Sequence, residues 1–292
     1  MTIIADSGST KTTWACFTPT TPQSHHILAN SLGINPIRDN EDIILKAIER
    51  GREVLYQACQ QTDSTPFLSE DVHQVFFYGS GCISPYSDTV KNLLQQVYPN
   101  ATILVESDML GAALALCGHK EGIACILGTG SNSCHFDGTR IVAQTPALGF
   151  ILGDEGSGAS LGKRLVGDIL KKQLPADIQQ AFYNETELSQ SEVINHVYRQ
   201  PQPNMFLASL TPFLDRHRDN QAVHALIIDE FRRFLQRNIR NYNRPDLPIH
   251  FVGGITATFA AELQEAVMQE GMKMGQTLAR PITGMVEFFH QL

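Results

Sequence analysis

Two glycine-rich turns of the same kind, each between two apolar stretches, are the parts of the sequence best suited to bind an anion. Residues 6–12 read DSGSTKT and residues 128–132 read GTGSN. Glycine lets the backbone approach a ligand closely, and the N–H groups and hydroxyls of such a turn form a concave surface that suits phosphate oxygens. One such turn alone is equally typical of an ordinary hairpin corner. Two of them, each opening a strand-turn-strand segment, favour a duplicated phosphate-binding unit.

Three aspartates accompany these turns. Asp6 ends the first predicted strand, where a carboxylate could hold hydrated Mg²⁺ or, as an Asx residue, only cap the turn. Asp108 follows the predicted strand 102–105 and begins a predicted helix, so it fits an N-cap as well as a proton acceptor at the carboxyl edge of a sheet. Asp154 lies in GDEGSG, residues 153–158, which also reads as a helix start with acidic residues near its positive end.

Alternating strand and helix patterns would position these residues. After the first hairpin we expect a strand at 26–30, a helix at 43–59, a strand at 75–78, a helix at 89–98, a strand at 102–105 and a helix at 108–117. This β-β-β-α-β-α-β-α order begins again at Gly122, and the second copy contains predicted helices at 158–173, 178–182, 192–198 and 222–242 before a strand at 249–252 and helices at 258–270 and 282–290. The repeated order predicts two α/β domains of ordinary size.

Composition sets the outer limits of function. The 292 residues carry a net charge of −8, with 42% hydrophobic and 18% charged residues, as in a soluble globular protein. Basic residues occur only singly or in short groups, so we do not expect nucleic acid as a partner. The chain opens MTIIAD without a basic or apolar leader, and no apolar stretch approaches about 18 residues. We therefore expect a cytoplasmic protein with no membrane partner.

The cysteines and histidines give no metal-binding pattern. The six cysteines form no C-x-x-C pair, and the ten histidines form no H-E-x-x-H motif. Most of the cysteines lie in predicted strands or helices. We expect reduced core thiols and no structural metal.

Six motifs, in order along the chain, resemble those of a known family. They are DSGST at 6–10, GINP at 33–36, SDMLGA at 107–112, GTGSN at 128–132, GFILGDEGSG at 149–158 and VGGI at 252–255. The set resembles the BadF/BadG/BcrA/BcrD-type ATPases and, more closely, N-acetylglucosamine kinases of eukaryotic type. The resemblance implies a two-domain actin-like, sugar-kinase ATPase fold with ribonuclease H-like halves and nucleotide between them. The implied domains are residues 1–117, completed by the terminal helix 282–292, and residues 118–281 with the helical insertion.

The resemblance also implies an activity, ATP-dependent phosphoryl transfer to the 6-hydroxyl of an amino sugar, with N-acetylglucosamine as the substrate. Asp108 would be the general base, and Asp6 would hold Mg²⁺. The residues that match or fit ATP contacts are Gly8, Ser9, Thr10, Lys11, Thr129, Gly130, Gly253, Gly254 and Thr258. Those that match sugar contacts are Asn35, Ser131, Asn132, Gly149 and Asp154. Whether Glu155 touches the ligand or only supports the site stays open.

Some features leave the substrate and other functions open. The segment 147–150 lacks the tryptophan and the glycine-rich run expected in a sugar-binding segment, and Trp14 is the only tryptophan. An activator that couples ATP hydrolysis to an iron–sulfur cluster is an alternative, although the cysteine-rich motif of such activators is absent. A non-catalytic sugar sensor is another, and the three aspartates argue against it. The apolar helix 282–292 could pack against a partner chain, which leaves a homodimer open, but packing on the first domain is favoured.

Overall fold

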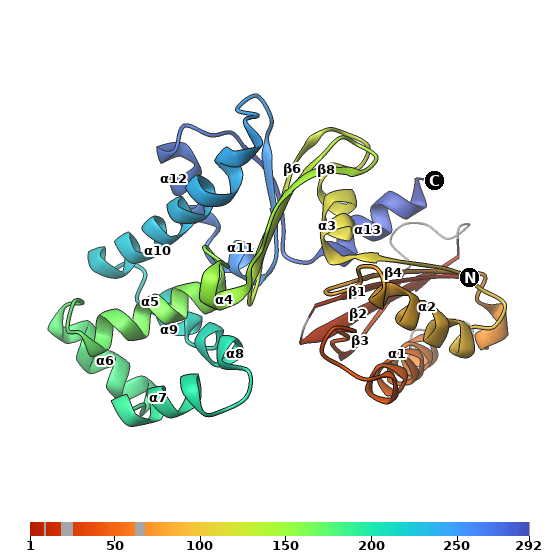
Figure 1. The fold of residues 1–292 in the computed structure, drawn as a ribbon, viewed down its shortest axis with the longest axis horizontal. Coiled ribbons are helices and arrows are strands. Elements are labelled where there is room, and N and C mark those ends of the chain that lie inside the picture. The colour runs from red at the N-terminus through yellow and green to blue at the C-terminus, as the bar shows by residue number, and fades with distance from the viewer. Residues whose placement is uncertain (9, 19–25, 62–67, 292) are drawn as a thin grey trace. The chain divides into compact units, whose positions relative to one another are not determined.

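The computed structural model describes residues 1–8, 10–18, 26–61 and 68–291 (Figure 1). The chain divides into two compact units: unit 1 comprises Met1–His119 and Arg280–Leu292, and unit 2 comprises Lys120–Ala279. Each unit contains a five-stranded sheet with helices packed against it. The predicted α/β class with a repeated strand order is therefore confirmed.

The sheet of unit 1 brings three strand ends to one edge. Its strands are β1 (Thr2–Ser7), β2 (Lys11–Phe17), β3 (Ile27–Leu32), β4 (Gln74–Gly79) and β5 (Thr102–Ser107), in the order β3-β2-β1-β4-β5. Strands β1, β2 and β3 are antiparallel neighbours, whereas β1, β4 and β5 run parallel. Ser7 pairs with Gly79, and Gly79 with Ser107. The carboxyl ends of β1, β4 and β5 therefore lie side by side, where ligands collect in open α/β sheets.

Helices cover both faces of this sheet. They are α1 (Glu41–Gln61), α2 (Tyr86–Val97), α3 (Asp108–Cys117) and α13 (Pro281–His290), with a 3-10 turn at Ser69–Asp71. On one face, Trp14 and Phe77 belong to a buried core shared with α1 and α2. Since successive strand residues point to opposite faces, Phe76 faces the other side, where Phe289 of α13 stacks on it with 4.2 Å between the ring centroids. The terminal helix thus packs on unit 1.

Unit 2 repeats the strand order. Its strands are β6 (Gly122–Leu127), β7 (Ser131–Phe136), β8 (Ile141–Thr145), β9 (Ile249–Val252) and β10 (Met274–Leu278), in the order β10-β9-β6-β7-β8. The patterns of the sequence did not predict β8 or β10. Both are edge strands with largely exposed or half-buried side chains, so neither shows the apolar run of a central strand. Hydrogen bonding to β7 and β9 defines them instead.

The helices of unit 2 include the predicted insertion and three short helices that the sequence did not predict. They are α4 (Gly149–Leu152), α5 (Gly158–Leu170), α6 (Ala176–Thr186), α7 (Gln190–Tyr198), α8 (Pro203–Ala208), α9 (Thr211–Arg216), α10 (Gln221–Phe234), the π-helical turn η2 (Leu235–Ile239), the 3-10 turn η3 (Arg240–Tyr242), α11 (Gly254–Thr258) and α12 (Ala260–Gln269). The sequence missed α4, α8 and α9, and the helix expected at 258–270 is interrupted at Phe259. The helix expected at 222–242 changes type at Leu235.

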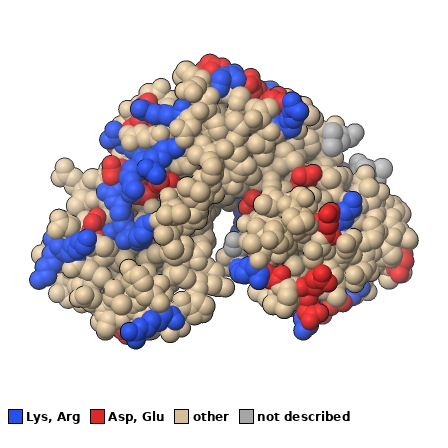
Figure 2. Space-filling model, in the orientation of Figure 1, with Lys and Arg blue, Asp and Glu red and all other residues tan. Residues whose placement is uncertain are grey.

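Basic side chains on unit 2 lie over α10 and the neighbouring helices (Figure 2). Several arginines there pair with glutamates: Arg232 and Arg240 with Glu270, Arg233 with Glu230, and Arg237 with Glu155. The positive charge in this region is therefore largely paired with carboxylates of the same unit. The pairs made by Glu155 and Glu230 bear on the candidate site.

Candidate active site

The β1–β2 turn of unit 1 is held in shape by a neighbouring segment. The Gly8 N–H donates to the Lys11 carbonyl at 3.0 Å, and the Gly33 N–H donates to the Thr10 carbonyl at 3.1 Å. A Cβ atom at Gly33 would clash with the Gly8 carbonyl oxygen, so only glycine fits against the turn. The GINP motif therefore supports the hairpin. Ser9, which the sequence also assigned to nucleotide binding, lies outside the described residues.

The hydroxyls of Ser7 and Thr12 form hydrogen bonds that fix this turn. The Ser7 and Thr12 hydroxyl oxygens lie 2.8 Å apart, and both residues are buried. Ser7 Oγ also accepts from the Ile34 N–H at 2.9 Å, while the Thr12 hydroxyl donates to the Leu32 carbonyl at 2.9 Å. These bonds attach the segment after β3 to the hairpin. The exposed Gly8, Thr10 and Lys11 are consequently the residues of this turn that a phosphate would meet.

Asp6 and Asp108 are half-buried carboxylates near each other at the carboxyl edge of the unit 1 sheet. Burial raises the pKa of Asp6 to about 7, the negative charge of Asp108 raises it as well, and Lys11 opposes the shift. Burial also raises the pKa of Asp108 to about 6, against hydrogen bonding from N–H groups at the start of α3. Two neighbouring carboxylates with raised pKa values are suited to take up a proton or to hold a cation.

The position of Asp108 bears on the two roles that the sequence left open. Ser107 is the N-cap of α3, and its side chain accepts from the Leu110 N–H at 3.3 Å. Asp108 is the first residue within the helix and does not supply the cap. Its carboxylate still accepts from N–H groups at the start of α3, and proton transfer stays a prediction for it.

A loop that the sequence reasoning missed brings Asn35 to the same edge. Residues 79–82 read GSGC and follow β4; the Ser80 N–H donates to the Ser7 carbonyl at 2.8 Å. Gly81 has φ 78°, and a Cβ atom there would lie 2.5 Å from Asn35 Oδ1. That Oδ1 accepts from the Ile37 N–H at 3.1 Å, which leaves the Asn35 amide group for a ligand. Two glycines directly after a buried strand were the sequence signal for this loop.

Cys82 in that loop lies close to the carboxylate pair. It is buried, and burial together with the charge of Asp108 raises the pKa of its thiol to about 12. All six cysteines of the chain are buried. A cluster held between subunits requires exposed cysteines, so this burial does not favour the iron–sulfur activator.

The β6–β7 turn of unit 2 is held by the start of α5. The Gly128 N–H donates to the Gly130 carbonyl at 2.9 Å. The Gly158 N–H donates to the Gly128 carbonyl at 2.8 Å, and the Ala159 N–H to the Thr129 carbonyl at 3.1 Å. The first N–H groups of α5 are therefore bonded to the turn, and what the turn offers to a phosphate is its own half-buried Thr129 and Gly130.

Asp154 contacts the same turn. It is half-buried and adopts the left-handed conformation with φ 57°. Its Oδ1 accepts from the Ser131 N–H at 3.2 Å, and its Oδ2 would lie 3.0 Å from a Cβ atom at Gly130. Burial raises the pKa of Asp154; the charge of Glu155 acts in the same direction, whereas the Ser131 N–H and Lys163 oppose it. The structure thus brings together Gly130, Ser131 and Asp154, as the sequence predicted.

Glu155 is bonded to two residues far along the chain. Its side chain is bonded to Arg237 Nε, and its Oε2 accepts from Asn238 Nδ2 at 3.3 Å. Burial alone would raise the pKa of Glu155, but hydrogen bonds from the backbone, Asn238 and Arg237 hold it below its usual value. These two partners favour a supporting role for Glu155, which stays a prediction.

The Gly253–Gly254 turn meets the β6–β7 turn at one edge of the sheet. Gly253 has φ 129°, and a Cβ atom there would clash with the Leu127 carbonyl oxygen. Gly254 is exposed, and a Cβ atom on it would have no described atom within 4 Å, so a flat ring could approach the backbone here. Thr258 ends α11, and its carbonyl accepts from Arg218 at 3.1 Å.

The two remaining predicted sugar contacts of unit 2 are Asn132 and Gly149. Asn132 Oδ1 accepts from the Ser133 N–H at 2.9 Å and from Gln144 Nε2 at 3.0 Å. Since neighbouring strand residues point to opposite faces, Asn132 and Ser131 do not share a face of β7. Gly149 is exposed with φ 71° and begins α4. The Asn132 side chain is thus bonded to neighbouring residues of unit 2, and its contact with the sugar stays a prediction.

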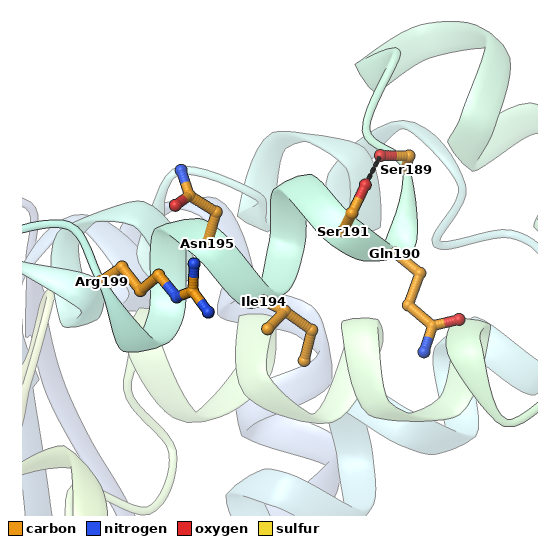
Figure 3. A pocket seen from close by; sticks show the side chains of 6 residues that line it. All are labelled: Ser189, Gln190, Ser191, Ile194, Asn195 and Arg199. Carbon is orange, nitrogen blue, oxygen red and sulfur yellow. Dashed lines mark hydrogen bonds between the residues drawn. The ribbon is translucent and has the colours of Figure 1, made fainter.

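A surface hollow of about 550 Å³ lies elsewhere in unit 2, along α7 (Figure 3). It is lined by Ser189, Gln190, Ser191, Ile194, Asn195 and Arg199. None of the predicted site residues lines it. Across the described ranges, no helix has the length and apolar character needed to cross a bilayer.

Comparison with known proteins adds to this geometry. Models of protein families and curated proteins give no significant match. A candidate N-acetylglucosamine kinase from Porphyromonas gingivalis is 41% identical, with 100% of this chain and 99% of that one covered and a TM-score of 0.90. A candidate N-acetylglucosamine kinase from Chromobacterium violaceum is 19% identical, covering 98% of each chain with a TM-score of 0.78. A ROK hexokinase from Thermus thermophilus is 13% identical, covering 98% and 97% with a TM-score of 0.55.

The fold is that of the two-domain ATPases to which sugar kinases and actin belong, and the two more distant structures support that fold alone. The similarity to the Porphyromonas gingivalis protein extends over the full chain at 41% identity. The chain belongs to the family of that protein, a family of the sugar-kinase type.

Proposed function

We propose that this protein is an ATP-dependent kinase that phosphorylates the 6-hydroxyl of an amino sugar, with N-acetylglucosamine as the substrate. The observation that carries the proposal is the pair of half-buried carboxylates, Asp6 and Asp108, at the ends of parallel strands. Family membership with a candidate N-acetylglucosamine kinase supports it. The six motifs further favour the BadF/BadG/BcrA/BcrD-type branch of these ATPases.

Asp108 acts as the general base. A pKa of about 6 leaves its carboxylate ionised at neutral pH and makes it a stronger proton acceptor than an ordinary aspartate. It takes the proton of the sugar 6-hydroxyl as that oxygen forms a bond to the γ-phosphorus. The bond from the γ-phosphorus to the bridging oxygen breaks, and ADP leaves with the electron pair.

Asp6 is the residue suited to hold Mg²⁺. It is one half-buried carboxylate beside another negative charge, which fits an ion that keeps most of its water and binds one or two carboxylates plus substrate phosphates. When bound, Mg²⁺ would neutralise charge on the phosphates. A cation there also favours the ionised forms of Asp6 and Asp108, which their burial otherwise opposes.

The other site residues bind and orient the two substrates. In unit 1 the exposed hairpin tip would contact ATP phosphates through Gly8, Ser9, Thr10 and Lys11, and in unit 2 the second turn would do so through Thr129 and Gly130. The adenosine would lie on Gly253 and Gly254, beside Thr258. For the sugar, hydroxyls would donate to Asp154, with further contacts from Asn35, Ser131, Asn132 and Gly149. A carboxylate held by a backbone N–H is a fixed acceptor, which suits recognition of hydroxyls.

The test is an ADP-release assay across a panel of hexoses and N-acetylhexosamines, followed by NMR of the product to locate the phosphate. We expect turnover with N-acetylglucosamine and a phosphate on its 6-oxygen. ADP release without any sugar, or with hexoses only, would contradict the proposed substrate.

A further inference from the structure

The segment of residues 146–154, which ends at the proposed sugar-binding carboxylate, is held at both ends by one residue. At its start, the Thr145 hydroxyl donates to the Asn238 carbonyl at 2.9 Å. At its end, Asn238 Nδ2 donates to Glu155 Oε2 at 3.3 Å. The backbone of Asn238 thus holds one end and its side chain the other, as in a compact surface loop whose ends lie close together.

The segment needs such support because of its own conformation. Leu148 has φ 55° and Asp154 has φ 57°, and left-handed backbone at residues other than glycine costs on the order of 1–3 kcal/mol unless its surroundings stabilise it. Between these residues the segment exposes large apolar side chains: Leu148 is 62% exposed, Ile151 74% and Leu152 69%. In the middle of the segment, Phe150 packs against the core of unit 2 and its carbonyl accepts from Lys163 Nζ at 2.8 Å. Since little of the other apolar surface is buried, the bonds at the two ends supply much of the remaining support.

The residues that make these bonds belong to the π-helical turn η2. Arg237 and Asn238 lie in it and both bond Glu155. A π turn takes one more residue than an α turn and so shifts the side chains that follow around the helix axis; such turns are frequent at functional sites. Tyr242, just beyond the turn, accepts the Thr145 N–H at 3.0 Å through its hydroxyl oxygen.

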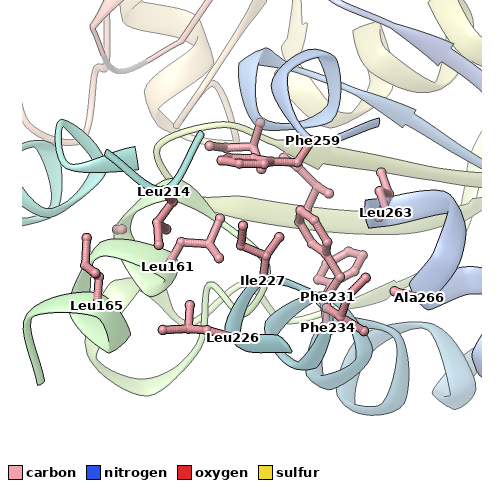
Figure 4. Packing of buried hydrophobic residues seen from close by; sticks show 14 of the residues in the cluster. Leu161, Leu165, Leu214, Leu226, Ile227, Phe231, Phe234, Phe259, Leu263 and Ala266 are labelled. Carbon is pink, nitrogen blue, oxygen red and sulfur yellow. The ribbon is translucent and has the colours of Figure 1, made fainter. Parts of the chain in front are cut away.

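The turn itself is fixed in the core of unit 2. Leu235 and Ile239 are buried, and Phe231 and Phe234 of the preceding helix belong to the same hydrophobic cluster (Figure 4). From that helix, the fully buried Glu230 accepts from the Gly156 N–H at 3.2 Å. The segment that follows Asp154 is therefore bonded to a rigid helix and to the π turn.

We propose that Arg237 and Asn238 are positioning residues for sugar recognition: by holding Thr145 and Glu155, they set the place of the Asp154 carboxylate. Neither residue touches the sugar, and the proposal rests on the proposed function. Removing the support changes the binding of the sugar more than the chemical step, because Asp108 and Asp6 belong to another unit of the chain.

The test compares Asn238→Ala with a matched control, Gln236→Ala. Gln236 lies in the same π turn, but its amide donates to Glu270 at 2.8 Å and not to the segment. We expect Asn238→Ala to raise the KM for the sugar about 5- to 20-fold, as for one lost hydrogen bond to a charged group, with kcat and the KM for ATP within about threefold. Gln236→Ala should leave all three constants near wild type.

A second pair of variants and a second measurement separate positioning from stability. Arg237→Gln should raise the sugar KM, and Arg237→Lys should restore part of it because the ammonium keeps the charge beside Glu155. Hydrogen exchange without any ligand should show faster exchange at the Ser131 and Gly156 amides in Asn238→Ala but not in Gln236→Ala. A folded Asn238→Ala protein with unchanged exchange would overturn the proposal, as would faster exchange with an unchanged sugar KM. If the wild type phosphorylates no sugar, the proposed function fails, and exchange still decides whether Asn238 holds the segment.

Discussion

The two glycine-rich hairpins of this protein have the same design but different surroundings. In each, a turn between antiparallel strands is braced by a distant segment: residues 32–34 brace the first, and the start of α5 braces the second. In unit 1 the brace uses the buried hydroxyls of Ser7 and Thr12, so the turn depends on side chains. In unit 2 it uses backbone bonds from Gly158 and Ala159.

The carboxylates beside the two hairpins differ more. Asp6 lies near a second carboxylate, Asp108, and both have raised pKa values. Asp154, whose pKa burial also raises, has no second raised carboxylate beside it among the described residues: it accepts the Ser131 N–H and is adjacent to Glu155, whose pKa is lowered and whose charge is balanced by Arg237. The first arrangement suits proton transfer and cation binding, whereas the second suits fixed recognition. The two copies of the repeated fold therefore differ in the surroundings of their carboxylates.

The largest effect should come from removing the base in unit 1. Asp108→Asn should lower kcat roughly 10²–10⁴-fold with substrate affinities within a few-fold, because the amide cannot accept the proton. Steady-state kinetics with N-acetylglucosamine measure this. Asp88→Asn, at an exposed aspartate in the first turn of α2, is the matched control and should be neutral. Near-normal turnover of Asp108→Asn would exclude it as the base.

Removing the other carboxylate of the pair should have a smaller effect that depends on magnesium. We expect Asp6→Ala to reduce kcat/KM about 10- to 100-fold at low free Mg²⁺ and less at high Mg²⁺, since the carboxylate acts on the hydration shell of the ion. Sugar binding measured by calorimetry should not change. The same magnesium dependence in both proteins would remove Asp6 from this role.

In unit 2, Asp154→Asn should change recognition and leave the chemical step. The amide replaces one acceptor oxygen by a donor, so the KM for the sugar should rise about tenfold while kcat changes little. The pH dependence of kcat should stay as in the wild type, because Asp108 is intact. A large loss of kcat with an unchanged sugar KM would reverse the contrast between the two hairpins.

The smallest effect concerns the stability of unit 1. The pKa values of Asp108 and Asp6 are raised to about 6 and about 7 in the folded state, which therefore binds protons more tightly than the unfolded state. Below about pH 4 both states are protonated and the two carboxyls cost no stability. Above the raised pKa values the two carboxylates are charged in the folded state, and their burial opposes folding. Stability should therefore fall as the pH rises from about 4 to about 7. Asp6→Asn and Asp108→Asn should each raise the melting temperature by about 2–4 °C at pH 7.5 without Mg²⁺, and by less at pH 4. Equal gains at both pH values would show another cause.

The local patterns of the sequence determined much of the fold. Helix α3 occupies the residues expected for it, and both hairpins and the duplicated order of elements appear as predicted. These features depend on periodicity and on turn residues, which act over a few positions along the chain. The short motifs likewise placed Asp6, Asp108 and Asp154 at strand ends and turns.

Other features were decided only when distant segments met. Ser107 takes the cap that Asp108 could have supplied, Glu155 is bonded to Arg237 and Asn238, and β10 forms as a strand only by pairing with β9. The raised pKa values of Asp6 and Asp108 also arise from burial, and that of Asp6 from the nearby charge of Asp108 as well. A sequence pattern records the type of a side chain, but its partners and its exposure depend on residues far along the chain. The roles of these side chains therefore followed from tertiary packing and not from local propensity.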